Sequence, residues 1–274
     1  MNYSNTNQLK DIVQRPYRVD IGQFLSRGWQ IFSKNAGGFI GFFSLTMVIF
    51  WGLTFVPGIG SIAAGIIVVV LYAGYFFVAF KIVKGSPTEF GDFFKGFKNT
   101  YFLHLLLVNL VQNIFGGFLS LVSIASFGLL FYNSFRAMFH SSLGTDFGEG
   151  NQLPNLPELP IPPILTPVLL MLGLVSLFSA IYLAVSYTFA IPLIVDKKIG
   201  FWNALETSRQ LITKKWVAFF GFSLVLFLIN LAGILVGLVG SILTVPFTIN
   251  AVAAAYESIV GLSSGSDTSL KELG

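Results

Sequence analysis

Amide side chains inside the long apolar runs are the residues of this sequence best placed to do chemistry. Asn109, Gln112 and Asn113 recur at intervals of three and four residues, so they share one face of a helix. Asn230 and Asn250 lie in two later apolar runs. Such groups can line a polar path or a lipid head-group pocket. They can equally join helices through hydrogen bonds worth about 0.6–2 kcal/mol each, and we favour this structural role.

Basic side chains at the borders of the apolar runs form a second group with defined chemistry. A cation close to a membrane surface gains about 1 kcal/mol from anionic lipid. We therefore predict interfacial contacts with anionic lipid for Lys34, Lys95, Lys98, Lys197, Lys198, Arg209, Lys214 and Lys215. The only acidic side chain at membrane depth is Glu257, at the cytoplasmic end of the last run, where it is expected to reach water.

No set of side chains typical of catalysis or metal binding is present. The two histidines, His104 and His140, lie at opposite ends of the third apolar region, and neither has a carboxylate at helical spacing. Cysteine is absent, which excludes thiolate ligands and cysteine nucleophiles. Zinc-protease, serine-hydrolase and phosphate-loop motifs are absent as well. We expect neither an enzyme nor a bound cofactor or metal ion.

The composition places these residues in a membrane. Of the 274 residues, 54% are hydrophobic and only 10% are charged, whereas about 25% are charged in an ordinary soluble domain. This chain has too few charges to cover a globule in water, so apolar surface must face lipid. The net charge of +4 arises from cations that flank apolar runs, which predicts membrane topology rather than nucleic-acid binding.

Six apolar runs are long enough to cross about 30 Å of hydrocarbon. They span 37–56, 60–83, a run from 101, 165–195, 216–236 and 239–258. Pro192 and Pro246 lie inside two of them and are predicted to kink the helices. With six spans and cytoplasmic termini, 15 of the 16 lysines and arginines lie inside, and only Arg136 lies outside. Seven spans would export five of these cations, so we predict six.

The third run is too long for one span, because residues 101–139 would extend about 58 Å as a helix. Polar residues at 126, 133, 136 and 140 form a stripe, which predicts an interfacial helix over 124–142 on the outer side. An external loop would then cover about 124–163. The alternative is a long third helix that protrudes and bends near Gly116 and Gly117.

The chain also shows an internal repeat. Residues 24–44 match residues 204–224 at an offset of 180, with Leu25/Leu205, Gln30/Gln210, Lys34/Lys214, Phe39/Phe219, Gly41/Gly221 and Phe42/Phe222 identical. Each match contains an amphipathic segment, and a third such segment covers 89–100. We therefore predict an all-α membrane protein of three parallel repeats, about 21–84, 88–195 and 200–260. Each repeat is a cytoplasmic amphipathic helix plus two spans, and polar cytoplasmic tails cover 1–20 and 261–274.

The amphipathic segment of the third repeat is expected to lie on the membrane surface. In "FWNALETSRQLITKK" (201–215), Trp202, Leu205, Ser208 and Ile212 share one face. Its tryptophan would sit at the interface and its cations would reach anionic head groups.

The stretch "IPLIVDKKIGFWNALETSRQLITKKWVAFFGF", together with "FLSRGWQIFSKNAGGFIGF", resembles a broad group of bacterial multi-span membrane proteins. That group includes the membrane domain of some glycerophosphodiester phosphodiesterases. The shared pattern is a span ending in an acidic residue, Asp196, then a helix carrying Ala204, Leu205 and Ser208, then a basic step into the next span. The resemblance implies six helices and a bacterial inner membrane. The soluble phosphodiesterase domain is absent here, and no activity carries over.

These observations together predict an integral membrane protein without catalysis. We expect it to organise lipids or partner proteins at the inner membrane, with the anionic lipids of the inner leaflet as its first partners. The alternative is a transporter or channel for a small or amphiphilic solute, which the repeats and the buried amides would suit. No buried acid suited to proton or sodium coupling is evident in the sequence, and this opposes the alternative.

Overall fold

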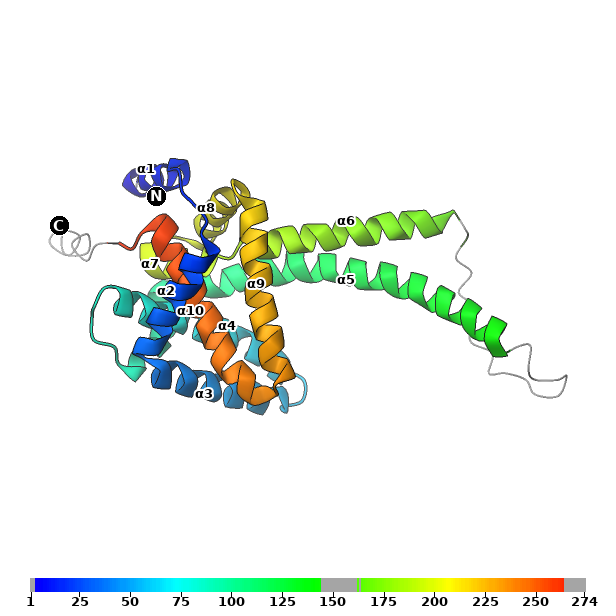
Figure 1. Cartoon of the computed structure of the whole chain (residues 1–274), viewed down its shortest axis with the longest axis horizontal. Coiled ribbons are helices and arrows are strands. Elements are labelled where there is room, and N and C mark those ends of the chain that lie inside the picture. The colour runs from blue at the N-terminus through cyan, green and yellow to red at the C-terminus, as the bar shows by residue number, and fades with distance from the viewer. Residues whose placement is uncertain (1–2, 144–161, 163, 264–274) are drawn as a thin grey trace. The chain divides into compact units, whose positions relative to one another are not determined.

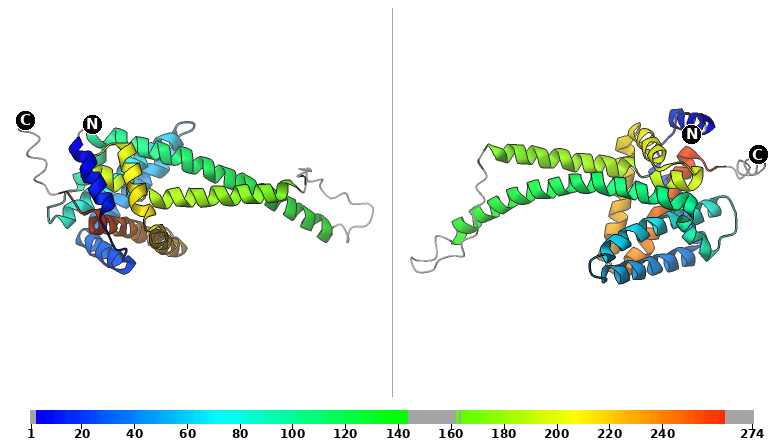
Figure 2. Two further views of the ribbon diagram at one scale, coloured as in Figure 1. Left: turned by 90° about the horizontal axis from the view of Figure 1, so that it is seen from above. Right: turned by 180° about the vertical axis from the view of Figure 1, so that it is seen from behind.

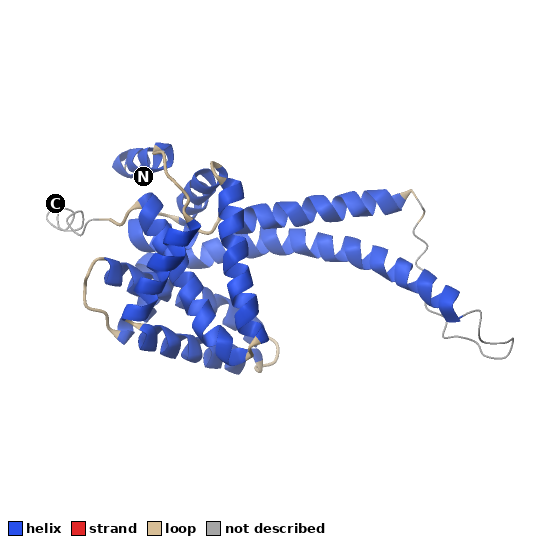
Figure 3. Ribbon diagram, in the orientation of Figure 1, coloured by secondary structure: helices blue, strands red, loops and turns tan. Residues whose placement is uncertain are grey.

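A computed structural model describes residues 3–143, 162 and 164–263 of the chain, and over these residues all regular structure is helical (Figures 1 and 3). The helices are α1 (Tyr3–Gln14), α2 (Ile21–Lys34), α3 (Ala36–Thr54), α4 (Gly60–Val83), the 3₁₀ helix η1 (Phe90–Phe97), α5 (Asn99–Leu143), α6 (Leu165–Ser186), α7 (Ala190–Lys197), α8 (Phe201–Thr213), α9 (Trp216–Leu235) and α10 (Leu238–Val260).

Six segments of the described chain are long and apolar enough to cross a membrane. They are Ala36–Thr54, Gly60–Val83, Asn99–Arg136, Leu165–Lys197, Trp216–Leu235 and Val239–Val260. The six predicted spans are thus confirmed as helices of sufficient length and apolarity. These helices indicate a multi-pass membrane protein.

The third span belongs to one uninterrupted helix. α5 has 45 residues, which corresponds to about 68 Å, and it continues through Gly116, Gly117 and residue 124. The structure therefore has the long third helix that was the alternative, and a separate helix beginning near 124 is not observed. Of the predicted external loop, residues 144–161 and 163 lie outside the described residues.

The two prolines within the predicted spans lie in different surroundings. Pro192 lies in the first turn of α7, where a helix does not need the missing N–H group. The helical path breaks just before it, at residues 187–189. Pro246 lies inside α10, which remains one helix through this position.

Ser208 of α8 satisfies the backbone groups that this break leaves free. Its hydroxyl donates to the carbonyl of Ser186 at 2.7 Å and accepts from the backbone N–H of Phe189 at 3.1 Å. The Ser208 side chain is fully buried. Broken helices persist at membrane depth only where such partners exist, so α8 stabilises the bend between α6 and α7.

The described chain forms two compact units, residues 1–111 with 185–274, and residues 112–184. Within the second unit, α5 and α6 meet through small side chains. The hydroxyls of Ser123 and Ser176 are 2.8 Å apart and buried, and Gly173 packs against Phe127 and Ser126. Small residues allow helices to approach closely in a membrane.

Within the first unit, α2, η1 and α8 each pack on another helix. α2 packs on α10, η1 on α4 and α8 on α7, while α3 and α4 lie side by side, joined by the turn 55–59 (Figure 2). In α8, Leu205, Ser208 and Ile212 are buried in the protein, whereas Trp202 is 63% exposed. The face of α8 that was predicted to lie on the membrane is therefore mostly covered by the protein's own helices, and only its Trp202 end is exposed.

α2 and α8 bury equivalent positions. At the offset of 180, every buried residue of α2 aligns with a buried residue of α8, in the pairs Phe24/Ala204, Gly28/Ser208, Ile31/Leu211 and Phe32/Ile212. Phe39 and Phe42 of α3 and their counterparts in α9, Phe219 and Phe222, are buried as well. The two segments thus pack in the same register.

The predicted N-terminal tail contains a helix that the sequence did not indicate. After α1, the Tyr17 hydroxyl donates to the Leu211 carbonyl of α8 at 2.5 Å, and the Lys214 ammonium donates to the Val13 carbonyl. Burial raises the pKa of Tyr17 to about 12. The N-terminal segment is therefore attached to α8.

Close packing of η1 on α4 gives a first testable prediction. A methyl group at Gly74 would overlap the backbone of Phe93, whereas one at Gly65 of the same helix would meet nothing within 4 Å. Gly74→Ala is expected to lower the free energy of unfolding by about 1–3 kcal/mol. Gly65→Ala is the matched control and should be neutral or stabilising. Unfolding of both variants in mixed micelles measures this, and equal stability of the two would contradict the packing.

Candidate anion-binding cavity

A cavity of about 450 Å³ opens in the first unit where α4 and α7 end and α5 begins. Five lysines line it, and they come from three different segments: Lys81, Lys84, Lys95, Lys98 and Lys198. The rest of the wall combines apolar and hydroxyl-bearing side chains with one carboxylate: Phe77, Phe80, Thr100, Tyr101, Val195, Asp196 and Ser263. The cavity therefore joins a basic rim to an aromatic wall.

The positions of the lysines follow from the ends of the helices. Lys81 lies in the last turn of α4 and Lys95 in the last turn of η1, and each of the two helices is followed by a further lysine, Lys84 and Lys98. Cations are favourable at helix C-termini because the helix dipole is negative there. Lys198 follows α7 in a left-handed conformation, with φ 51° and ψ 39°. Three chain segments thus direct cations to one cavity.

Asp92 fixes two of these lysines. Its carboxylate lies 2.8 Å from the Lys81 ammonium and 2.6 Å from the Lys95 ammonium, and it accepts the Glu89 backbone N–H at 2.8 Å. Burial alone would raise the pKa of Asp92. The hydrogen bonds from Glu89, Lys81 and Lys95 outweigh burial and lower that pKa to about 2. Asp92 therefore stays ionised and holds both ammonium groups.

Asp196 ties the end of α7 to the chain after α10. Its side chain is 1% exposed and pairs with Lys197 at 3.0 Å. It accepts the Tyr256 hydroxyl at 3.1 Å and the Ser263 backbone N–H at 3.0 Å. Lys197 also donates to the Gly261 carbonyl at 3.0 Å. The one carboxylate in the cavity wall is thus already neutralised.

Three lysines of the cavity remain available to a ligand. Lys84, Lys98 and Lys198 are exposed, and no carboxylate in the described part of the chain pairs with them. Ammonium groups beside apolar surface at a helix end are suited to a phosphate whose lipid tail lies along the aromatic wall.

The other predicted lipid contacts divide into paired and exposed groups. Arg209 forms an ion pair with Glu206 at 2.6 Å, and this arginine lowers the pKa of the Glu206 carboxyl, against a smaller opposing effect of burial. Lys34 and Lys215 are exposed and do not line the cavity. Several basic side chains that were predicted to contact lipid thus also contact the protein itself: Lys95, Lys197, Arg209 and Lys214.

The predicted polar amides make separate contacts. Asn109 donates to the Gly65 carbonyl of α4 at 3.4 Å, and Asn230 donates to the Thr248 hydroxyl of α10 at 3.0 Å. Asn250, which is buried, donates to the Pro246 carbonyl of its own helix at 2.8 Å. These hydrogen bonds join or support helices and do not gather the amides at one place.

Gln112 and Asn113 lie on the same helix as Asn109, but they belong to the second compact unit. Gln112 is half-buried and Asn113 is exposed. The helical face formed by the three amides therefore crosses from one compact unit to the other.

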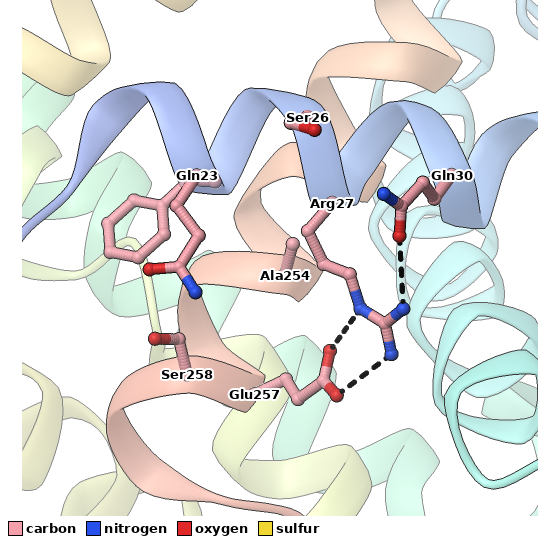
Figure 4. A pocket seen from close by; sticks show the side chains of 8 residues that line it. Gln23, Ser26, Arg27, Gln30, Ala254, Glu257 and Ser258 are labelled. Carbon is pink, nitrogen blue, oxygen red and sulfur yellow. Dashed lines mark hydrogen bonds and ion pairs between the residues drawn. The ribbon is translucent and has the colours of Figure 1, made fainter.

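A second, smaller cavity of about 400 Å³ lies between α2 and α10 (Figure 4). Arg27 donates to both oxygens of Glu257, at 3.3 and 3.2 Å, and to the side chain of Gln30 at 3.2 Å. Glu257, which was expected to reach water, is thus paired. With side-chain exposures of 39% and 26%, this pair contributes little to stability, and its opposite charges leave the cavity without a net charge.

Sequence reasoning found three of the five lysines as lipid contacts and used Lys81 and Lys84 only for topology. It assigned no partner to Asp92, although its three-residue spacing from Lys95 is a recognisable ion-pair signal. The hydrogen bonds that Asp196 accepts from Tyr256 and Ser263 join residues 60 and 67 positions apart, so no local signal could have shown them. Among the described residues, no group of three or more histidine, aspartate or glutamate side chains could hold a metal ion.

Comparison with known proteins gives no relative. No family model, no curated protein and no solved structure matches the chain. What the protein does must therefore be argued from its own residues.

Proposed function

We propose that this chain is a non-enzymatic protein of the bacterial inner membrane that holds anionic lipid at its cytoplasmic side. The lysine-lined cavity carries this proposal, because three unpaired ammonium groups lie beside aromatic side chains at the ends of membrane-spanning helices. Basic pockets between the cytoplasmic ends of helices are typical sites for phosphate head groups. By keeping such lipids bound, the protein would organise them around itself.

The charge distribution supports cytoplasmic termini. Lys81 lies in the last turn of the second span, Lys84, Lys95 and Lys98 lie between the second and third spans, and Lys198 follows the fourth. All of them therefore fall on one side of a six-span topology. The positive-inside rule assigns this side to the cytoplasm. The anionic inner leaflet would then face the cavity.

Three parallel repeats are part of the same proposal. Each pair of long segments follows a short helix. η1 packs on α4 and α8 packs on α7, which are the second segments of the pairs before them in the chain, and α2 packs on α10, the second segment of the last pair. The equivalent burial in α2 and α8 supports a common origin for the first and third repeats. Such an arrangement brings the three short helices to the same side of the membrane.

Lipid binding has more support than transport. Asn109 and Asn230 are engaged in bonds between helices, and Asn250 supports its own helix. The cavity, in contrast, lies at helix ends, where a head group meets the protein surface.

Lipid titration tests the proposal. Added anionic phospholipid should raise the unfolding temperature of the detergent-solubilised protein, and phosphatidylcholine should not. The variant Lys84→Gln/Lys98→Gln/Lys198→Gln should bind anionic lipid at least about tenfold more weakly. A matched variant, Lys10→Gln/Arg15→Gln/Arg18→Gln, removes the same charge from exposed positions of the N-terminal segment outside the cavity and should bind normally. An equal loss in both variants would leave general surface charge as the explanation and refute the cavity.

A further inference from the structure

The charge of the cavity bears on which head group it accepts. Asp92 pairs with Lys81 and Lys95, and Asp196 pairs with Lys197, whereas no carboxylate of the described residues pairs with Lys84, Lys98 and Lys198, so three positive charges remain unpaired. A phosphodiester of an ordinary anionic lipid carries a single negative charge. One such head group would leave most of these charges uncompensated.

The cations come from separate parts of the chain. Lys81 and Lys95 are held by Asp92, with their ammonium groups at 2.8 and 2.6 Å from its oxygens, and Lys84 and Lys98 follow the same two helices. Lys198 enters from the end of α7, where its backbone is left-handed and its N–H donates to the Ile194 carbonyl at 3.1 Å. The cavity lysines that form no ion pair within the described residues thus come from two places, the ends of α4 and η1 and the end of α7.

The size and the lining of the cavity suit a ligand larger than a free ion. Its volume of about 450 Å³ lies within the range of small-molecule sites. Phe80 and Val195, both at least nine-tenths buried, give it an apolar floor, and the ring of Tyr101 packs edge-on against Phe77 with centroids 4.8 Å apart. Apolar surface of this kind favours a phosphate that carries a glycerol or acyl portion over an inorganic anion.

We propose that the cavity selects lipid head groups with two phosphate charges over head groups with one. This inference rests on the proposed function and deepens it by naming the ligand class. One phosphate contacts Lys84 and Lys98, at the ends of α4 and η1, and the second contacts Lys198, at the end of α7. Asp92 acts as a positioning residue, because its ion pairs with Lys81 and Lys95 hold the ends of α4 and η1 together without contacting the ligand.

The test compares lipids at equal membrane charge. The purified protein is bound to vesicles that contain either phosphatidylglycerol or, at half its mole fraction, cardiolipin, a lipid with two phosphodiesters. Because the surface charge is then the same, a difference in affinity reports the head group. We expect about tenfold tighter binding to the cardiolipin vesicles. Lys198→Gln should abolish the preference and retain binding to phosphatidylglycerol, whereas Lys215→Gln should leave the preference intact.

Each further outcome decides a separate question. Equal affinities for the two kinds of vesicle would overturn the selectivity and leave the proposed lipid binding standing. Equal binding to neutral vesicles would refute the proposed function itself. Soluble pyrophosphate is the probe for a free anion, and we expect it to displace the lipid only weakly. Pyrophosphate binding as tight as that of cardiolipin would show that the ligand need not be a lipid, and would overturn that part of the inference.

Discussion

Replacing Asp196 with alanine is expected to lower the free energy of unfolding by about 3–5 kcal/mol, because removal of one partner from a buried charged network leaves the others uncompensated. The lost carboxylate is 1% exposed and pairs with Lys197. It also accepts hydrogen bonds from Tyr256, whose side chain is fully buried, and from the backbone of Ser263. The variant would leave the Tyr256 hydroxyl and the Ser263 N–H without this acceptor, and Lys197 without its counterion, with only the Gly261 carbonyl still accepting from it.

Asp20→Ala is the matched control for this change. The Asp20 carboxylate is exposed and accepts only the backbone N–H of Gln23 at the start of α2, at 2.9 Å. Loss of such an N-cap costs about 1 kcal/mol. Unfolding of both variants in mixed micelles of increasing denaturing detergent gives the comparison. Equal destabilisation by the two substitutions would contradict the role assigned to Asp196.

The second large effect is expected for Ser208→Ala, with a loss of about 2–4 kcal/mol, since a buried group left unsatisfied costs about 1–3 kcal/mol. Without the hydroxyl, both the Ser186 carbonyl and the Phe189 N–H in the break between α6 and α7 lose their partner. The alanine variant keeps the packing of the side chain nearly unchanged, so the loss reports the hydrogen bonds.

Ser33→Ala on α2 provides the control for Ser208. The Ser33 hydroxyl is exposed and bonds only the Gln30 carbonyl of its own helix, at 3.2 Å. Its removal should change stability by less than about 0.5 kcal/mol. If both serines prove equally dispensable in the same unfolding measurement, the break is stabilised by something other than α8.

Gly28 of α2 and Ser208 of α8 lie 180 residues apart, at positions that are buried in both helices, and they make different contacts. A side chain on Gly28 would lie 2.5 Å from the Ala251 Cα, so its absence allows α2 to lie directly on α10. Ser208 fills the break before α7. The same register thus supports close contact in one segment and a hydrogen-bonded bend in the other.

The long helices could be predicted from the sequence because the signal is local. An apolar run of about 20 residues has few other stable outcomes. The continuity of α5 could not be decided in this way, since its polar stripe also fits an interfacial helix. Pro192 was predicted to kink the fourth span, and the helical path breaks at residues 187–189, which include the position four residues before this proline. The sequence did not show that Ser208, 22 residues from Ser186, forms a hydrogen bond at this break. Contacts between distant segments leave no periodic trace.

In the candidate site too, local features could be predicted from the sequence and contacts between distant segments could not. The basic residues were visible as border cations, but their convergence on one cavity depends on how α4, η1 and α7 end. The face of α8 was visible as a period, yet hydrophobic periodicity does not tell whether lipid or protein covers it. Leu205 and Ile212 are buried by protein, and Trp202 remains exposed.

The most direct test of the cavity is the identity of the lipid that stays with the protein. Native mass spectrometry of the protein extracted gently from bacterial membranes would give this. We predict that the wild type retains an anionic phospholipid, that the variant Lys84→Gln/Lys98→Gln/Lys198→Gln loses it, and that Lys10→Gln/Arg15→Gln/Arg18→Gln keeps it. Retention of the same anionic lipid by both variants, or of zwitterionic lipid alone by the wild type, would contradict the account.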